Sequence, residues 1–526
     1  MTTSALPPRS RCLFAVLLIL ITAISAPAVH AAVKPSRARA IDFDEKIIFR
    51  SPENPGFAAW VQLWAEPNGD LGTKFLLRRQ PAPGERIERK PLDVHRYEAV
   101  GLPAKYDFAS LITETVFMRS RDSGATWTET LRGTENELNQ SADSGCMSPI
   151  TLADGRMLSL SWGMPGCLRE STDRGRTWRR LHDLMDPAFY DVAPFTIRLL
   201  ADQKTLVIFC PYARSWGKGK LVAGRLHHRP GTRAAWQAAL FFSTDFGKTL
   251  TGPIPIFPNV PVTESDFCEL PTGDLLFIQN EMFAGGTAHR QLIRNTKRGW
   301  VPEEMEPVDK LAPEIFVRTN EGYLVGASRN APYVWSEDDG LTWQAVEDIK
   351  SGQYQPRALL LKDNRILFLW HKGGDLPYGQ ADMYIGQHTF KLQVVDPRPR
   401  SQLKLARVFD EKAQKYICAF DATLTTTDGN PISNKSIEFS IVARGAAGYE
   451  PFGGATPWVH GSKQTITTDA TGVARAIYTD QSAVTDIHQT YQLAARFDPQ
   501  REDPAYLPAT SLTIEYYAVT PTGEAK

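Results

Sequence analysis

The chain has 526 residues and carries equal numbers of Lys plus Arg and of Asp plus Glu, 59 each. Hydrophobic residues make up 42% and charged residues 22%, values typical of a globular protein, which argues against a disordered or fibrous chain. Because there is no basic excess, the composition gives no support to nucleic-acid binding. The 12 Trp, 38 Gly and 37 Pro indicate many short strands joined by turns, so the sequence predicts an all-β fold.

The first residues have the pattern of a secretory signal peptide. Arg9 and Arg11 precede an apolar run over residues 13–24, and small residues then lead to Ala31. We expect residues 1–31 to be removed near Ala31. An uncleaved anchor is the alternative, but the run is shorter than the about 20 residues that a membrane span needs. The sequence therefore predicts a secreted or periplasmic protein with no membrane span after cleavage.

An octet with the pattern Ser-x-Asp-x-Gly-x-Thr-Trp repeats along the chain. Copies begin at Ser120, Ser171 and Ser336, and a fourth begins at Ser243 with Leu250 in place of Trp. The Asp can accept hydrogen bonds from backbone N–H groups of a tight turn, and the Gly supplies the backbone angle that the turn requires. The Trp can anchor the turn between two sheets. We therefore interpret these Asp residues as structural rather than catalytic.

A second pattern, an apolar run, a turn and another apolar run, occurs six times and predicts hairpins. A hairpin followed by a strand, an octet and a fourth strand makes a four-stranded sheet. Six such units predict a six-bladed β-propeller over residues 42–397. An array of β-sandwiches explains the octets poorly. The six hairpins cover residues 57–75, 148–162, 193–212, 264–280, 312–328 and 355–371.

The first unit carries a polar, Pro-rich insertion over residues 80–111, which we expect to cover a central pocket. Beyond a linker at residues 396–400, about seven short strands predict an immunoglobulin-like β-sandwich over residues 402–520. The tail is similar to bacterial immunoglobulin-like modules, and we expect it to act as a spacer or to dock a protein or polysaccharide. No phosphate loop, nucleotide fingerprint or metal-ligand spacing appears, so we predict no cofactor and no metal.

The octets resemble the Asp-box, and four of them on a six-bladed propeller are similar to the sialidase (neuraminidase) superfamily, also called BNR-repeat proteins. The resemblance covers residues 42–397. It specifies the fold better than the activity, because Asp-boxes also occur in carbohydrate binders. It implies a glycan substrate whose carboxylate is held by three Arg, a Tyr nucleophile, a Glu that takes the proton of that Tyr, and an Asp acid/base on a loop of the first blade.

Two of the family arginines have counterparts. Arg50 stands just before the first strand of the first blade, and Arg329 stands seven residues before the Ser of the last octet. The second family arginine is absent. Gln279 and Asn280 occupy its place, and these side chains can hydrogen-bond a substrate but cannot neutralise a carboxylate. Arginines of the following strand are alternative replacements, namely Arg290 and Arg294.

The resemblance also implies the reacting groups. Glu264 stands nine residues before the turn Gly273, where the family has its Glu, with Asp266 and Glu269 as competing candidates. Tyr354 begins the last hairpin, where the family has its Tyr nucleophile. Counted back from the turn, however, the register is off by one residue and would place Gln355 there.

The acid/base residue follows no motif. Asp93, with His95 beside it, and Asp107 are the candidates in the first insertion. His371 ends the last hairpin and is a further acid/base or substrate-binding candidate.

Three functions stay open at this level. We favour an exported exo-α-sialidase-like glycoside hydrolase that releases a terminal sialic-acid-like or other acidic sugar. A non-catalytic glycan-binding propeller is the first alternative. A polysaccharide lyase that uses Tyr354 with His371 or His95 is the second.

Overall fold

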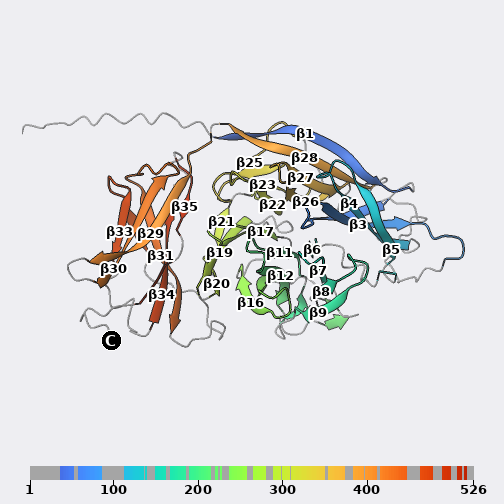
Figure 1. The fold of residues 1–526 in the computed structure, drawn as a ribbon, viewed down its shortest axis with the longest axis horizontal. Helices are drawn as coiled ribbons and strands as arrows, with labels where there is room; N and C mark the ends of the chain where they lie inside the picture. Colours follow the sequence, from blue (N-terminus) through green and yellow to red (C-terminus); the bar gives the residue numbers. More distant parts are fainter. Residues whose placement is uncertain are drawn as a thin grey trace, which may run out of the picture. The chain divides into compact units, whose positions relative to one another are not determined.

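A computed structural model gives the fold of the chain, and every regular element that it describes is a β-strand (Figure 1), which confirms the all-β prediction. No membrane-spanning helix occurs in the described part of the chain. The described residues are 36–52, 57–85, 112–134, 137–138, 148–161, 166–184, 189–192, 194–214, 220–222, 225–227, 236–257, 265–279, 288–297, 299–308, 310–349, 354–372, 383–395, 397–410, 415–446, 463–477, 489–498, 506–511 and 514–517.

Six small antiparallel sheets follow one another between residues 37 and 395. The first sheet holds β2 (Phe57–Ala65), β3 (Leu71–Arg79), β4 (Ile112–Ser120) and β5 (Thr128–Thr134). The second holds β6 (Ile150–Thr151), β7 (Met157–Ser161), β8 (Cys167–Ser171) and β9 (Arg179–Asp183). The third holds β10 (Phe189–Val192), β11 (Thr196–Leu199), β12 (Leu206–Arg214), β15 (Trp236–Ser243) and β16 (Thr251–Ile256). A separate pair, β13 (Lys220–Val222) and β14 (Arg225–His227), lies between β12 and β15 in the chain.

The fourth and fifth sheets continue this order. The fourth holds β17 (Ser265–Glu269), β18 (Leu275–Gln279), β19 (Ala288–Thr296), β20 (Gly299–Pro302) and β21 (Glu306–Val308). The fifth holds β22 (Ile315–Arg318), β23 (Leu324–Ala327), β24 (Val334–Ser336) and β25 (Gln344–Ala345).

The sixth sheet joins the two ends of this region. It holds β26 (Tyr354–Leu360), β27 (Ile366–His371), β28 (Tyr384–Val395) and, from the beginning of the chain, β1 (Arg37–Arg50). The pairing runs from Arg37 opposite Val395 to Arg50 opposite Tyr384. β1 thus begins before residue 42, where the sequence placed the start of this region.

The four octets connect the third and fourth strands of their sheets and share one set of hydrogen bonds. In the copy that begins at Ser171, the serine hydroxyl donates to Asp173 and accepts from the Gly175 N–H, both at 2.8 Å. Asp173 also accepts from the N–H of Thr177 at 2.8 Å and from its hydroxyl at 2.5 Å. Trp178 is buried in a cluster with Phe117 of the first sheet. The Asp side chains therefore hold the turns, as the sequence predicted.

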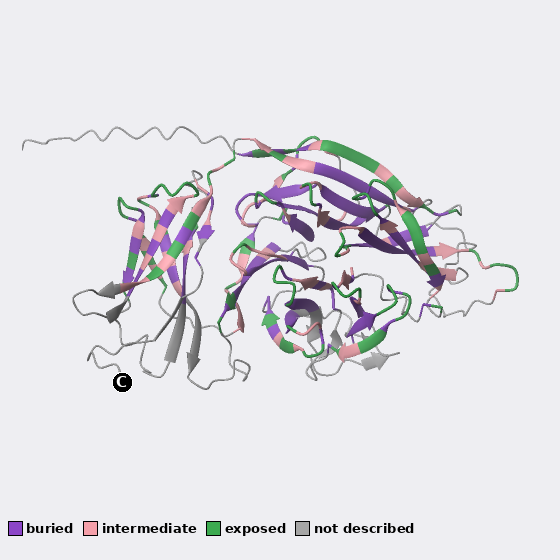
Figure 2. Cartoon of the chain, viewed as in Figure 1, coloured by how far each residue is buried: buried purple, intermediate pink, exposed green. Residues whose placement is uncertain are grey.

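One strand of each of the six sheets joins a closed ring of neighbours, and we call these strands the first strands. They are β2, β6, β11, β17, β22 and β26. β2 lies beside β6 and β26, β11 lies beside β6, and β22 lies between β17 and β26. The remaining step joins β11 to β17, where the Thr196 hydroxyl donates to the Ser265 carbonyl at 3.4 Å. Most residues of β2, β17, β22 and β26 are buried (Figure 2), whereas β6 and most of β11 are only partly buried.

The tail forms two further sheets over a core of its own. One sheet holds β29 (Ser401–Asp410), β30 (Lys415–Thr426) and β33 (Val473–Ile477). The other holds β31 (Ser436–Ala446), β32 (Gln464–Thr467), β34 (Gln489–Phe497), β35 (Ala509–Thr510) and β36 (Ile514–Tyr517). Buried side chains from both sheets, including Phe420, Phe439 and Leu493, make up this core.

Candidate active site

Tyr354, His371 and Arg50 lie at the same end of the strands of the sixth sheet. Tyr354 pairs with His371, His371 pairs with Ile385, and Arg50 pairs with Tyr384. Arg50 therefore lies on the outermost strand, about 14 Å from Tyr354 if each strand spacing is about 4.8 Å. Its guanidinium carbon lies 4.8 Å from the centre of the Tyr384 ring. The structure does not bring Arg50 to Tyr354.

A β-bulge places Tyr354 at the edge of the sheet. The register shifts between the pairs Tyr354–His371 and Arg357–Leu369, so one extra residue sits in β26. Gln355 takes a left-handed backbone angle there, with φ of 46°. Such a conformation costs about 1–3 kcal/mol in a residue other than Gly. The bulge accounts for the offset of one residue counted from the turn, and Tyr354 rather than Gln355 stands opposite His371.

Tyr354 and His371 are buried polar side chains whose polar atoms lack a normal hydrogen-bond partner in the described part of the chain. Their exposed fractions are 3% and 1%, and their ring centres lie 5.0 Å apart at an interplanar angle of 64°. Among the described residues, neither the Tyr354 hydroxyl nor either ring nitrogen of His371 has a hydrogen-bond partner of normal geometry. Most buried polar atoms in folded proteins are hydrogen-bonded, so two such side chains together mark a candidate site.

His371 is neutral at this site. Burial lowers its pKa to about 3, and the positive charges of Arg329 and Arg357 add to the effect. A neutral imidazole can accept or donate one hydrogen bond, but it is not a strong acid at neutral pH. His371 therefore fits the role of an uncharged hydrogen-bond partner better than the role of a cationic acid.

Arg329 lies against Tyr354 and a buried carboxylate. Its guanidinium carbon is 5.1 Å from the centre of the Tyr354 ring, and its Nε is 3.7 Å from Oε2 of Glu314. Glu314 is 2% exposed, and its backbone N–H donates to the Ser328 hydroxyl at 3.1 Å. A positive charge at the face of an aromatic ring is favourable. The structure thus brings Arg329 and Tyr354 together, two residues that the sequence selected separately.

The sequence analysis missed Glu314. It directly precedes β22, just as Glu264 directly precedes β17. The sequence thus has an acidic residue immediately before the first strand of two sheets. Only Glu264 was selected as a candidate, although Glu314 stands in the same position. Arg357 was missed as well. It is 8% exposed, and its guanidinium carbon lies 5.7 Å from the centre of the Phe195 ring.

The competing acidic candidates of the fourth sheet are held elsewhere. Asp266 accepts from Nη2 of Arg198 with both carboxylate oxygens at 2.6 Å, and one oxygen also accepts from the Phe267 N–H at 2.9 Å. Glu269 accepts from the backbone N–H of Ala201 at 2.7 Å. Neither carboxylate has a described contact with Tyr354.

The arginine alternatives of β19 are occupied by acidic partners. Arg290 donates to Glu306 at 3.0 Å. Arg294 donates to Asp274 at 2.8 Å and to Glu303 at 2.5 Å. Neither side chain therefore takes the place of the missing family arginine.

Gln279, which stands at that place in the sequence, is fully buried. It pairs with Ser265 across the sheet, and its Oε1 lies 3.3 Å from Nδ1 of His289. The other predicted site residues, Glu264, Asp93 and Asn280, lie outside the described residues, as do His95 and Asp107.

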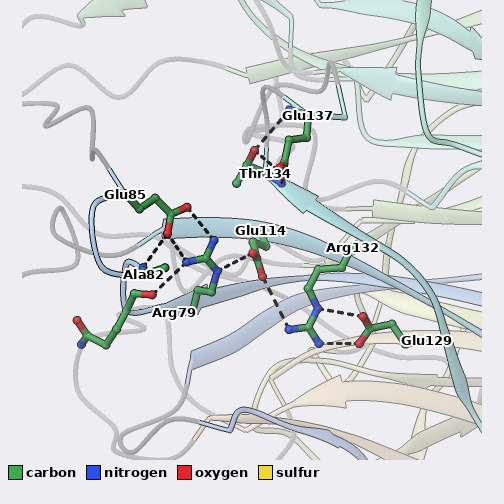
Figure 3. Close-up of polar contacts among 9 residues, drawn as sticks. Arg79, Ala82, Glu85, Glu114, Glu129, Arg132, Thr134 and Glu137 are labelled. Carbon is green, nitrogen blue, oxygen red and sulfur yellow. Dashed lines mark hydrogen bonds and ion pairs between the residues drawn. The ribbon is translucent and has the colours of Figure 1, made fainter.

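Ion pairs fix the start of the insertion that carries Asp93 (Figure 3). Arg79 ends β3, where the insertion leaves the first sheet, and its Nε donates to Glu114 at 2.6 Å. Its Nη1 and Nη2 donate to Glu85 at 2.7 and 2.9 Å, and the Ala82 N–H also donates to Glu85 at 2.8 Å. The Arg79 hydrogen bonds and this N–H lower the pKa of Glu85 to about 2. β2 and β3 are antiparallel, so the insertion, which follows β3, starts at the end of the sheet where β2 begins.

A cavity of about 410 Å³ lies inside the ring of first strands. It falls in the range of about 300–1,000 Å³ that is typical of ligand pockets. Glu66, Arg198, Asp266 and Arg357 are its charged lining residues, and Tyr354, His371 and Arg329 are not among the residues that line it. No group of three His, Cys, Asp or Glu side chains within the described ranges is placed to hold a metal ion. Each first strand contributes to the wall, through Leu63, Ile150, Ile197, Asp266, Ile315 and Ala358.

Comparisons with known proteins find similar folds but no family. No family model and no curated protein matches the chain. A protein of unknown function from Dyadobacter fermentans is 15% identical, with a TM-score of 0.43, and the match covers 68% of this chain and 99% of that one. An α-L-arabinofuranosidase from Fusarium graminearum is 10% identical, with a TM-score of 0.42, over 67% of this chain and 98% of that one.

An intramolecular trans-sialidase from Ruminococcus gnavus is 11% identical, with a TM-score of 0.42, over 65% of this chain and 96% of that one. These similar structures include β-propeller enzymes that act on carbohydrates. The identities and TM-scores are too low to assign this chain a family or an activity.

Proposed function

We propose that the six sheets are the blades of a six-bladed propeller and that the protein is an exported glycoside hydrolase of the sialidase type. The closed ring of first strands, the completion of the sixth sheet by β1 and the shared turn geometry of the four octets support this fold. The substrate is a glycan that ends in a sialic-acid-like or another acidic sugar.

The observation that carries the activity is the buried hydroxyl of Tyr354, which has no hydrogen-bond partner among the described residues, beside Arg329. Leaving a buried hydroxyl without a partner costs about 1–3 kcal/mol, so its retention needs a function. In the proposed reaction the Tyr354 oxygen attacks the anomeric carbon and forms a glycosyl-enzyme bond while the leaving glycan takes a proton from Asp93. Glu264 accepts the phenol proton. Water then attacks the anomeric carbon, gives a proton to the Asp93 carboxylate and displaces Tyr354, whose oxygen takes its proton back from Glu264.

Arg329 supplies the positive charge that faces the substrate carboxylate. Its contact with Glu314 holds the guanidinium in place and offsets part of its charge. Gln279 and Asn280 stand where the family has an arginine, so fewer cations are available than in a typical sialidase. This balance favours an acidic sugar whose carboxylate is also held by neutral hydrogen bonds.

A polysaccharide lyase is the second candidate, and the neutral His371 beside Tyr354 favours it. In a lyase, a neutral base removes the C5 proton of a uronic acid, and the bond at C4 then breaks to leave an unsaturated sugar. Tyr354 would protonate the leaving oxygen, and Arg329 would stabilise the carboxylate.

The test uses the mature protein and its Tyr354→Phe variant. Both are assayed with a fluorogenic α-sialoside, with fluorogenic uronides and with uronic-acid polysaccharides monitored for ultraviolet absorption of unsaturated products. Release of the fluorophore that is lost in the variant supports the hydrolase. Unsaturated products identify a lyase. A folded protein that turns over none of these substrates removes the hydrolase proposal and leaves glycan binding.

We propose that the tail is an immunoglobulin-like module that docks a protein or a polysaccharide outside the cytoplasm. Its own two-sheet core supports an independent module. Size analysis of residues 402–520 expressed alone tests the module, and pull-down on insoluble polysaccharides tests the docking. An unfolded fragment would contradict the proposal.

A further inference from the structure

A second cavity lies between the first and second sheets, and its volume is about 420 Å³. Its wall includes Trp64 of β2, Arg119 of β4 and Thr151 of β6, together with Arg174 and Arg176 of the octet in the second sheet. Trp64 and Thr151 also line the cavity inside the ring, so the two cavities adjoin. We call this second cavity the inter-sheet groove.

The inter-sheet groove opens at the sheet edge opposite to Tyr354. Tyr354 is the first residue of a first strand, whereas the groove includes Glu66 and Gly155, which lie in the turns that follow β2 and β6. A hairpin turn lies at the far end of the strand that it follows. Its described lining includes none of Tyr354, His371 and Arg329, although it shares Trp64, Glu66 and Thr151 with the cavity inside the ring.

The groove carries three arginines and two carboxylates, and two of the arginines have no acidic partner among the described residues. Asp173 accepts three hydrogen bonds within its own octet, and Glu66 accepts one from the indole of Trp64 at 2.8 Å. Arg174 and Arg176 are exposed, and neither forms an ion pair with a described residue. Arg119 uses one nitrogen, Nη2, for Asp70 at 2.7 Å. Both carboxylates are thus engaged locally, while two guanidinium groups are not.

Two buried polar atoms of residues in this wall lack partners. Nε of Arg119 and the hydroxyl of Thr151 have no hydrogen-bond partner among the described residues. Both residues line the groove, and buried polar atoms in folded proteins usually have partners, so this wall is a candidate site for the polar groups of a ligand. The indole of Trp64 adds an apolar wall; it packs so closely on Gly72 that a Cβ there would lie 2.1 Å from the ring.

We propose that the inter-sheet groove binds an acidic oligosaccharide, with Arg174 and Arg176 on its carboxylate or sulfate groups and with Arg119 and Thr151 on its ring substituents. Planar guanidinium groups match both kinds of anion. The proposal does not depend on hydrolysis at Tyr354. It gives the protein a second point of attachment to an acidic polymer, away from the residue that we propose to react.

Titration calorimetry on the full mature chain tests the proposal, in a Tyr354→Phe background that prevents turnover. The ligands are a galacturonic acid trimer, a sulfated glycosaminoglycan tetrasaccharide and neutral maltotetraose. We expect at least one acidic ligand to bind, more weakly at high salt, and the neutral one not to bind. The two acidic arms distinguish a carboxylate from a sulfate ligand.

The test variant combines Arg174→Asn with Arg176→Gln, because Asn tolerates the left-handed φ of 59° at position 174. We expect about tenfold weaker binding, equivalent to the loss of one charge-assisted hydrogen bond. Lys248→Ala is the matched control, since Lys248 holds in the third sheet the octet position that Arg176 holds in the second. Thr151→Val tests the wall without removing charge, and we expect binding to weaken several-fold.

Failure of both acidic ligands to bind overturns the proposal. Unchanged affinity in the double variant, or an equal loss in Lys248→Ala, also overturns it. Because catalysis is absent from the background, these outcomes leave the hydrolase proposal untouched.

Discussion

Tyr354 and His371 stand opposite each other on two paired strands, with ring centres 5.0 Å apart, and their polar side-chain atoms have no hydrogen-bond partner of normal geometry among the described residues. Packing alone would favour Phe and Leu at such positions, since these residues carry no polar atoms to desolvate. The pair therefore carries a cost to stability that a ligand would remove by bonding to both groups.

Tyr354→Phe separates activity from stability. We expect turnover to fall by about a thousandfold or more, because the proposed nucleophile is removed. We also expect the free energy of unfolding to stay equal or to rise by up to about 1 kcal/mol, because an unpartnered buried hydroxyl is deleted. Urea denaturation together with the fluorogenic assay measures both quantities. A clear loss of stability would show that the hydroxyl has a structural partner.

His371 makes stability depend on pH. Its pKa in the folded protein, about 3, lies below the ordinary value of 6.5, so between these limits the unfolded chain binds a proton that the folded chain does not. The free energy of unfolding is therefore unaffected by His371 above about pH 6.5. As the pH falls toward 3 it decreases by up to about 1.4 kcal/mol per pH unit. We expect His371→Asn to flatten the stability curve between pH 6.5 and 4. Denaturation at several pH values checks this, and equal slopes in both proteins would contradict it.

Arg329 and Glu314 form a buried ion pair, so we expect the effects of substituting them on the free energy of unfolding not to be additive. Arg329→Met leaves a buried carboxylate with less compensation, and we expect a loss of about 3–5 kcal/mol. Adding Glu314→Gln should recover part of this loss, because the stranded charge is removed. Calorimetric unfolding of the two single variants and the double variant gives the coupling energy. Additive losses would mean that the 3.7 Å contact contributes little.

Arg79 anchors the insertion that carries Asp93. Arg79→Met removes the donors to Glu85 and Glu114 while keeping most of the apolar stem. We expect limited proteolysis to cut between residues 86 and 111 several-fold faster, and turnover to fall if Asp93 acts as the acid. Arg156→Met is a matched control, because Arg156 also bridges two carboxylates, Asp154 and Glu170, in another sheet. Equal cleavage rates in both variants would contradict an anchoring role.

The sequence predicted the elements that depend on local patterns. The octets reveal their turns because Asp, Gly and Thr must stand at fixed spacing for the hydrogen bonds to form, and Gly273 and Gly322 mark hairpin turns where a positive φ is required. Arg329 was found in the same way, by its fixed distance from an octet.

The remaining features depend on contacts distant in sequence. The bulge at Gln355 changes the register by one residue, and its one local signal, Pro356, was not used, although strands tolerate proline mainly at edges and bulges. The pairing of Tyr354 with His371 and the contact of Arg329 with Glu314 follow from strand register and from the approach of neighbouring sheets. The start of β1 at Arg37 was missed for the same reason, since its partner strand ends at Val395.

The pairing of β1 with β28 also sets the order in which the chain can fold. Arg39 donates to Gln393 at 2.6 Å across 354 residues of sequence. During synthesis β1 emerges first, but its partner β28 emerges only when nearly the whole region has been made. β1 therefore stays unpaired for most of that time. Long-range pairing of this kind slows folding and exposes strand edges to aggregation. The sixth sheet can therefore be completed only after β28, which ends at Val395, has left the ribosome.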